Sequence, residues 1–348
     1  MLGHYDEAAA TYAAMVDQTS HANGAYTADE KNNRGIFLER LGSVYHEQNK
    51  VDQAIAAYQK MVDMGGDQAK RGYQFQVDTY NDARMFNKAV AVSQQAIAAF
   101  PKDRDLKLML AGELVDEGKV DEGLSMTTAL LSNTNDDRTV YFALGNMYTR
   151  LRRWKDADEA LAKATPLATK KEDKLYLLFL KGALADRQKH LDQAESYFRQ
   201  ALDVDPDNAM TLNYLGFMFA DKGIRLPEAL KLIRKAVELE PMNGAYLDSL
   251  GWAYFKLGEY ELAEENLHQA VERDQTDPTV HDHLGDLYEK TGRIRQAAAQ
   301  WELSIAEFQK TPSIDVEPGD MGKVQHKLEG ARVKLAKQEN AAGEVKPN

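Results

Sequence analysis

The hydrophobic and polar positions of the chain follow a pattern that returns about every 34 residues. In most copies a leucine and a glycine come first, and an aromatic residue lies three positions after the glycine. Small residues lie twelve and nineteen positions after it. The clearest copy contains Leu250, Gly251, Tyr254, Ala263 and Ala270. Small residues in two segments of one copy predict two helices that cross closely, because small side chains let two backbones approach each other.

Eight copies of the pattern lie in phase along the chain. Two of them keep the frame with Val77 or Ala111 in the glycine position. A large residue lies about sixteen positions after the glycine, and we expect it to fill the space beside the crossing point. The six copies with glycine in this position are those of Gly42, Gly145, Gly182, Gly216, Gly251 and Gly285.

The same residues also mark where the helices begin and end. Gly258 falls where the first helix of its copy should close in a left-handed conformation. Pro241 follows the second helix of the preceding copy, which it cannot continue. Thr27 and Glu30 have the spacing of a capping box, so the helix that carries Gly42 is predicted to begin early.

The pattern resembles the tetratricopeptide repeat (TPR), a helix–turn–helix unit, over roughly residues 1–310. The resemblance implies an all-α fold, a right-handed superhelical solenoid of antiparallel helix pairs with a C-terminal capping helix. Such an array suits a chain of 348 residues, because each repeat buries its apolar face only against its neighbours. The stretch from Tyr246 to Ala270 is similar to bacterial TPR proteins, some of them envelope lipoproteins that act as adaptors. That similarity favours a periplasmic or envelope-associated protein, with a cytoplasmic one as the alternative.

The chain is predicted to have five parts. These are residues 1–20, the second helix of a truncated first repeat; 21–310, a solenoid of about eight repeats; 311–320, a linker; 321–338, a capping helix; and 339–348, a disordered tail. A half-repeat leaves an apolar face uncovered. We therefore expect a fragment of a longer protein, whose missing N-terminal part would have carried a signal or a lipid anchor. The uncovered face also allows a homo-oligomer.

Composition and charge narrow the classes of partner. The chain has 43 lysine and arginine residues against 55 aspartate and glutamate residues, a formal net charge of -12. This excess of acid opposes binding to nucleic acid or anionic lipid and favours a basic or neutral ligand. No cysteine is present, which excludes disulfides and thiolate metal sites. The longest apolar run, Leu175–Leu180, is far shorter than the ~20 residues of a membrane span, so no membrane insertion is predicted.

The sequence shows no residue pattern typical of catalysis. His281 and His283 are two positions apart on a predicted helix and so face different ways, and His281 falls in a packing position. Acidic pairs such as Glu264 and Glu265 are interpreted as solvated helix faces. Phosphate-binding loops and dinucleotide glycine patterns are missing. We therefore predict a protein that is not an enzyme, with no catalytic residue, no metal and no cofactor.

In TPR proteins the first helix of each pair lines a concave groove, and this resemblance implies which residues meet a partner. In the first three repeats these positions are polar and acidic, as at Glu39, Asp78 and Asp105. From the fourth repeat onward several are aromatic, and Asn146 and Asn213 are placed to grip a peptide backbone. The alternative is that the aromatic side chains pack against the neighbouring repeat and expose only an edge. The candidate partner-binding residues are Phe142, Asn146, Arg150, Tyr176, Phe179, Arg187, Met210, Asn213, Phe217, Asp248, Trp252, Phe255 and Lys256.

These features predict a protein–protein interaction scaffold or adaptor that binds an extended or helical segment of another protein in its concave groove. One alternative is a structural, self-assembling repeat protein. Another is the non-catalytic part of a larger enzyme or of a secretion or envelope complex. Capture of a chaperone's C-terminal carboxylate is disfavoured, because Glu39, Asp78 and Asp248 stand where lysine would be needed.

Overall fold

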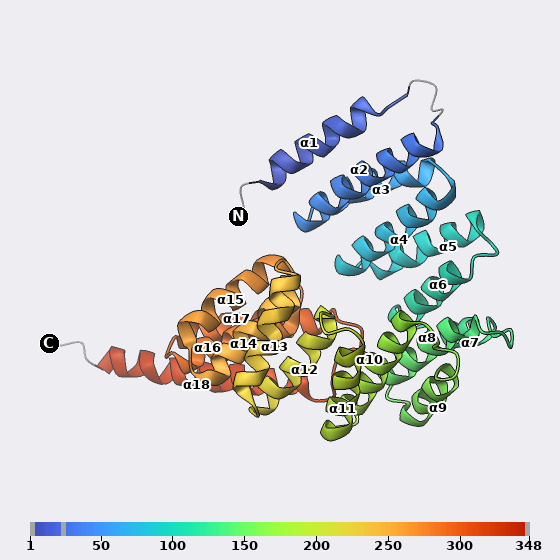
Figure 1. Cartoon of the computed structure of the whole chain (residues 1–348). Coiled ribbons are helices and arrows are strands. Elements are labelled where there is room, and N and C mark those ends of the chain that lie inside the picture. The colour runs from blue at the N-terminus through green and yellow to red at the C-terminus, as the bar shows by residue number, and fades with distance from the viewer. Residues whose placement is uncertain (1–3, 22–25, 345–348) are drawn as a thin grey trace. The chain divides into compact units, whose positions relative to one another are not determined.

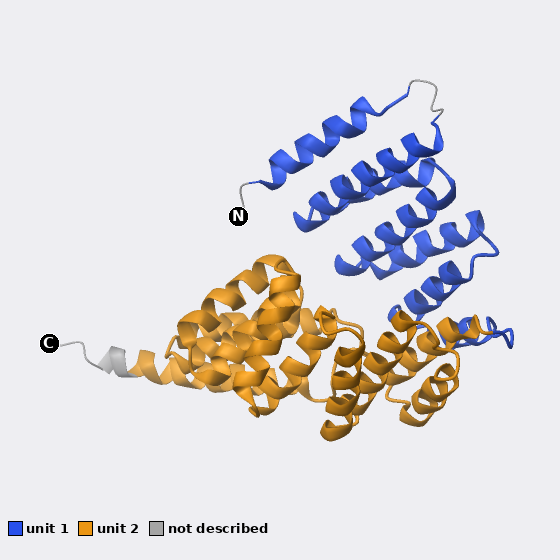
Figure 2. Cartoon of the chain, viewed as in Figure 1, with its two compact units in different colours: residues 1–134 blue, residues 135–348 orange. Residues whose placement is uncertain are grey.

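The structure, a computed structural model, describes residues 4–21 and 26–344. The regular structure of this described part is entirely helical, with eighteen α-helices and no strand (Figure 1). The chain forms two compact units, residues 1–134 and residues 135–348 (Figure 2). The predicted all-α solenoid of helix pairs is confirmed.

The first unit contains a single helix followed by three helix pairs. The single helix, α1 (Tyr5–Gln18), packs against α2, and its Ala9 and Val16 are buried there. The capping box at the start of α2 is present: Thr27 accepts a hydrogen bond from the Glu30 amide, and the Glu30 carboxylate accepts one from the Thr27 amide. The three pairs are α2 (Ala28–Glu47) with α3 (Val51–Asp63), α4 (Gly66–Asp82) with α5 (Phe86–Ala99), and α6 (Arg104–Asp116) with α7 (Val120–Thr128).

The second unit contains five helix pairs and a final helix. Each pair packs against the next, and the final helix packs on the last pair. The pairs are α8 (Asp137–Arg150) with α9 (Trp154–Ala164), α10 (Lys171–Arg187) with α11 (Leu191–Val204), α12 (Ala209–Lys222) with α13 (Leu226–Leu239), α14 (Gly244–Leu257) with α15 (Tyr260–Arg273), and α16 (Pro278–Lys290) with α17 (Ile294–Phe308).

In the six repeats that contain it, the repeat glycine lies where the two helices of its pair cross. A Cβ atom added at Gly42 would lie 2.3 Å from the ring of Tyr58, and one added at Gly285 would lie 2.3 Å from the indole of Trp301. These distances are far below van der Waals contact, so the predicted close crossing and its filling side chain are both present. The other crossing glycines, which meet a large side chain in the same way, are Gly145, Gly182, Gly216 and Gly251.

A left-handed residue closes the first helix of each pair. Gly258 takes this position after α14, with φ of 82°. Arg152 and Lys189 take the equivalent position after α8 and α10, with φ of 56° and 63°. A side chain in this conformation costs about 1 kcal/mol, which glycine avoids. The turn is therefore fixed by the packing of the repeat rather than by glycine alone.

The final helix, α18 (Asp320–Glu344), covers the end of the second unit. Its Val324, Leu328 and Ala331 are buried in one cluster with Leu284 and Trp301. This is the predicted capping helix, whose apolar side closes the stack.

The end of α18 differs from the sequence-based expectation. A disordered tail was predicted from residue 339, but the helix continues to Glu344, so the prediction is wrong for residues 339–344. This stretch is rich in alanine and glutamate and contains no proline, a composition that favours helix. Glu339 also lies 3.4 Å from Arg295 of α17. The rest of the predicted tail lies outside the described residues.

Candidate functional site

The predicted partner-binding residues lie on α8, α10, α12 and α14, the first helices of four successive pairs in the second unit. Six of them belong to one hydrophobic cluster that runs through these helices, and they differ in exposure. Of these six, Phe142, Phe179 and Trp252 are buried, and Met210, Phe217 and Phe255 are partly buried.

The three buried aromatic side chains pack against the neighbouring repeat. Phe142, Phe179 and Trp252 are 6%, 8% and 7% exposed. Trp252 lies between two rings, stacked on Phe255 at 4.9 Å and on His283 at 4.0 Å between centroids. For these three residues the packing alternative holds, and they offer a partner little surface.

Two tyrosines supply the aromatic surface instead. Tyr176 is 40% exposed and meets Phe142 edge to face, with ring centroids 5.3 Å apart. Tyr214 is 46% exposed and meets Phe179 in the same way at 4.9 Å. Sequence reasoning missed Tyr214 because it assigned the neighbouring Asn213 to the surface. If the assignment of first-helix positions to the groove is off by one residue, it selects a side chain that points about 100° away around the helix.

The asparagines of this surface have different environments. Asn146 is exposed on α8, between Phe142 and Arg150 at four-residue spacing, so all three share one face of the helix. Asn213 is buried on α12, and its side-chain oxygen has no hydrogen-bond partner among the described residues. An unsatisfied buried acceptor costs about 1–3 kcal/mol.

Asp248 forms a buried pair with a histidine. The carboxylate lies 2.9 and 3.0 Å from Nδ1 of His283 on α16, which donates the hydrogen bond when the ring is protonated. Burial opposes the charged ring, but Asp248, together with Asp282 and Asp286, raises the pKa of His283 above its usual value of 6.5. Lys256 lies 5.0 Å from the centre of the Trp252 ring above this pair. Asp248 and His283 therefore hold two repeats together and are inaccessible to a partner.

The neighbouring histidine has the structural role that was predicted for it. His281 is buried, with Nδ1 2.8 Å from the side-chain oxygen of Gln300 and Nε2 3.0 Å from the carbonyl of Gln275. Both ring nitrogens are engaged. Across the described residues, no group of three or more histidine, aspartate or glutamate side chains is placed to hold a metal ion.

The segment between α17 and α18 returns to the first helices of earlier repeats. We refer to residues 311–319 as the acidic strap. Arg150 of α8 donates two hydrogen bonds of 2.8 Å to the two carboxylate oxygens of Asp315. Arg187 of α10 donates one of 3.2 Å to Glu317. Two predicted site residues, Arg150 and Arg187, are thus occupied by the chain itself.

A third arginine completes this contact. Arg152, in the turn after α8, donates a hydrogen bond of 2.8 Å to the backbone carbonyl of Val316 and lies 3.5 Å from Glu317. Arg150, Arg152 and Arg187 together form what we call the arginine clamp. The sequence placed Arg150 and Arg187 on the partner-binding surface but did not indicate Arg152, because Arg152 lies in a turn and not on a first helix.

Two family profiles match the chain. A TPR repeat profile matches residues 251–292, and a tetratricopeptide repeat profile matches residues 1–69 and 179–244. The chain is a tetratricopeptide-repeat protein. The matched segments fall in both compact units, in agreement with the helix pairs and crossing glycines of each.

Solved structures with a similar solenoid include two that cover most of this chain. Yeast Tom70 superposes with a TM-score of 0.56 and 17% identity, over 91% of this chain and 67% of that one. A tetratricopeptide repeat protein from Parabacteroides merdae superposes with a TM-score of 0.52 and 14% identity, over 76% and 99% of the two chains. At these identities the likeness concerns the fold.

A human relative matches a shorter stretch. Protein O-mannosyl-transferase TMTC1 from Homo sapiens is 30% identical over 138 residues, 39% of this chain. The match spans 16% of that protein's length. TPR proteins are in general non-catalytic scaffolds that bind other proteins, and the repeats suggest a protein-interaction scaffold. The bacterial origin favoured by the sequence stays a prediction.

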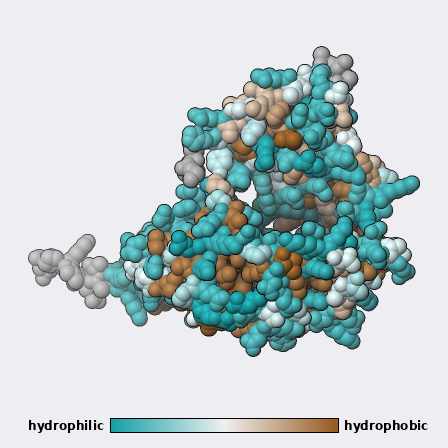
Figure 3. All heavy atoms as spheres, viewed as in Figure 1, coloured by the Kyte–Doolittle hydropathy of each residue, from teal (hydrophilic) through white to brown (hydrophobic). Residues whose placement is uncertain are grey.

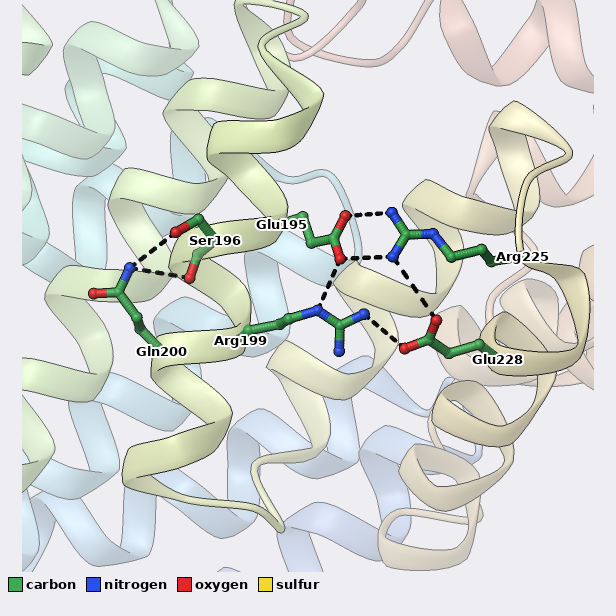
Figure 4. A network of polar contacts seen from close by, with 6 residues as sticks. All are labelled: Glu195, Ser196, Arg199, Gln200, Arg225 and Glu228. Atoms are coloured by element: carbon green, nitrogen blue, oxygen red, sulfur yellow. Dashed lines mark hydrogen bonds and ion pairs between the residues drawn. The ribbon is translucent and has the colours of Figure 1, made fainter.

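The second helices of the TPR pairs carry a separate charged network (Figure 4). Arg225, before α13, binds both carboxylate oxygens of Glu195 on α11. Arg199 donates to Glu195 at 2.8 Å and to Glu228 at 2.7 Å. The hydrogen bond from Arg225 is the main reason that the pKa of Glu195 is lowered. The two arginines and two glutamates of this network balance one another's charge, and they join two adjacent repeats.

The described residues contain no helix that is both long and apolar enough to cross a membrane.

Proposed function

We propose that this TPR protein is an interaction scaffold that binds a segment of a partner protein on the first helices of its second unit. The observation that carries the proposal is the pair of exposed tyrosines, Tyr176 and Tyr214, each supported by a buried phenylalanine. The repeats pack through the buried rings, so the exposed rings are not needed to close the core. Tyrosine held rigidly in this way is a common anchor in protein-recognition surfaces.

Polar groups near these rings suit a bound backbone. Asn146 presents an exposed amide that can both donate and accept a hydrogen bond, whereas Asn213 is buried and offers a partner little surface. Hydrophobic residues on the face of the second unit seen in Figure 3 lie in patches bordered by hydrophilic ones. Aromatic anchors with a polar rim are typical of surfaces that bind an extended or helical segment.

Site-specific photo-cross-linking tests the proposal. A photoreactive phenylalanine analogue replaces Tyr176, Tyr214 or, as a control, Leu303, which is 46% exposed on α17 away from these helices. We expect adducts with a discrete protein at 176 and 214 and none at 303, and mass spectrometry then maps the bound segment.

The partner identified in this way is then purified and titrated. We expect Tyr176→Ala with Tyr214→Ala to weaken its binding by about tenfold or more, since truncation of an aromatic anchor costs about 1–2 kcal/mol or more. Leu303→Ala should leave the affinity unchanged. Equal affinity for the wild type and the tyrosine variants would contradict the proposal.

A further inference from the structure

We infer that the arginine clamp selects an acidic segment of the partner, and that the acidic strap occupies the clamp until such a segment displaces it. The inference rests on the proposed function and adds to it the chemistry of the partner. Arg150, Arg152 and Arg187 come from two successive repeats. The strap that they hold is more than one hundred residues away in the sequence.

The clamp recognises its occupant through groups that any acidic segment carries. Asp315 receives a bidentate pair of hydrogen bonds from Arg150, and Glu317 receives one from Arg187. Between them, Arg152 binds a backbone carbonyl, which every peptide presents. Bidentate binding of a carboxylate is the geometry for which arginine is most selective. The clamp therefore fits a segment with two carboxylates two residues apart.

The strap is bound loosely enough to leave. The side chains of Asp315 and Glu317 are 33% and 34% exposed, and ion pairs of such exposure contribute about 0.2–1 kcal/mol each. Pro312 and Pro318 lie near the two ends of the strap, which forms neither helix nor strand. Within it, the Asp315 amide donates to the Pro312 carbonyl at 2.9 Å, so the strap retains a turn of its own.

Release of the strap does not require the capping helix to unpack. Val324 and Leu328 anchor α18 in the core of the last repeat. Lys327 adds ion pairs of 2.8 Å to Asp282 and 2.7 Å to Asp286 on α16. These contacts are separate from the clamp, so the strap is a tethered loop between two fixed helices.

The local charge at the clamp explains why we infer an acidic ligand there, although the net charge of the chain favours a basic or neutral one. The net charge of -12 favours a basic or neutral ligand for the chain as a whole. The clamp concentrates three arginines at one place, and a negatively charged occupant is already seated there. The clamp therefore selects an acidic segment although the net negative charge of the whole chain repels it.

Tethering determines how strongly the strap competes. A short tether holds its occupant at an effective concentration on the order of 1 mM. A peptide with the strap's own sequence, added in solution, must compete with this concentration. For a peptide that binds an open clamp near 100 μM, the strap lowers the apparent affinity about tenfold.

The test uses the full chain and a fluorescein-labelled peptide with the sequence of residues 311–319, followed by fluorescence anisotropy. Two release variants are compared with the wild type: Asp315→Asn with Glu317→Gln, and Asp315→Lys with Glu317→Lys, in which the strap is repelled by the clamp. We expect both to bind the peptide about tenfold more tightly than the wild type. A further variant adds Arg150→Gln and Arg187→Gln to the first release variant, and we expect it to lose the gain.

Each outcome decides the matter. Tighter binding in the release variants that disappears with the arginines, and with a peptide carrying Asn and Gln in place of its two acids, supports the inference. Equal binding by wild type and release variants overturns it, as does a gain that survives loss of the arginines. If the inference fails while cross-links at Tyr176 and Tyr214 persist, the scaffold function stands and its acidic selectivity falls. Loss of those cross-links would instead contradict the scaffold function itself.

Discussion

The two units satisfy the charges of their first helices in different ways. In the first unit, neighbouring first helices pair with each other. His46 of α2 lies 3.0 Å from Asp82 of α4, and Asn81 of α4 donates a hydrogen bond of 2.9 Å to Glu113 of α6. These contacts recur at about the spacing of the repeat and link successive first helices within the unit.

The second unit contains such contacts too, and adds another kind. Arg138 pairs with Asp173 on the next first helix at 2.9 Å, but Arg150 and Arg187 bind the acidic strap instead. A charge that is balanced by an adjacent repeat stays balanced as long as the array is folded. A charge balanced by a tethered loop can change partner without any repeat unfolding, and this gives the second unit an exchangeable surface.

The largest effects are expected in the shared core, where the two units should respond alike. Gly42→Val in the first unit and Gly285→Val in the second both place a side chain against a buried ring, and each should cost about 3 kcal/mol. Hydrogen exchange of the affected helix pair, followed by mass spectrometry, measures the loss. Gly112→Ala is the control: an added Cβ meets nothing within 4 Å there, so it should be neutral or stabilising by about 0.5–1 kcal/mol. Very different losses in the two units would show that their cores are not equivalent.

The second prediction contrasts a buried pair with an exposed one. Asp248→Asn removes the carboxylate from buried His283, and we expect a loss of about 2 kcal/mol in α14 and α16. Asp82→Asn removes the partner of half-exposed His46 and should cost less than about 1 kcal/mol in α2 and α4. Local exchange rates in the two regions give both values. Equal losses would contradict the burial that separates the two pairs.

The third prediction concerns pH. The pKa of His283 is raised in the folded protein, so the folded state binds more protons than the unfolded chain. The stability from this pair is fully present below pH 6.5 and is lost as pH rises through the raised pKa. Amides of α16, corrected for intrinsic rates, should therefore open more readily at pH 9 than at pH 6. His283→Gln should remove the difference, and persistence of it in this variant would assign it to another group.

The smallest effect compares two left-handed residues. Lys189→Gly should raise the free energy of unfolding, measured by urea denaturation, by about 0.5–1 kcal/mol, because it relieves the strained turn after α10. Arg152→Gly relieves the equivalent turn but also removes one arm of the clamp, so its gain should be smaller by about 0.5 kcal/mol. Equal gains would mean that the contact of Arg152 with the strap contributes nothing measurable.

Features with the period of the repeat were predictable from the sequence, and the others were not. Gly285 and Trp301 recur in a fixed frame, and so do the first-helix positions of Phe142 and Arg150. Which member of an adjacent pair such as Asn213 and Tyr214 faces outward depends on the exact rotation of a helix, which the pattern defines only to about one residue.

The contact between the strap and the arginine clamp could not be predicted from the repeat pattern, for a different reason. The sequence showed a linker with acids at 315 and 317 between prolines, but no repeat position points to their partners. The contact with Arg150 spans 165 residues. It depends on small rotations between successive repeats that add along the second unit, and no local residue pattern encodes their sum.

The most direct test of the exchangeable surface is the distance between the strap and the clamp in solution. The chain has no cysteine, so Ser313→Cys and Lys189→Cys allow two spin labels in an otherwise wild-type protein, read by electron–electron double resonance. We predict one narrow distance distribution that broadens and lengthens when Arg150→Gln and Arg187→Gln are added. A broad distribution with the arginines in place, or a narrow one that survives their loss, would contradict the account.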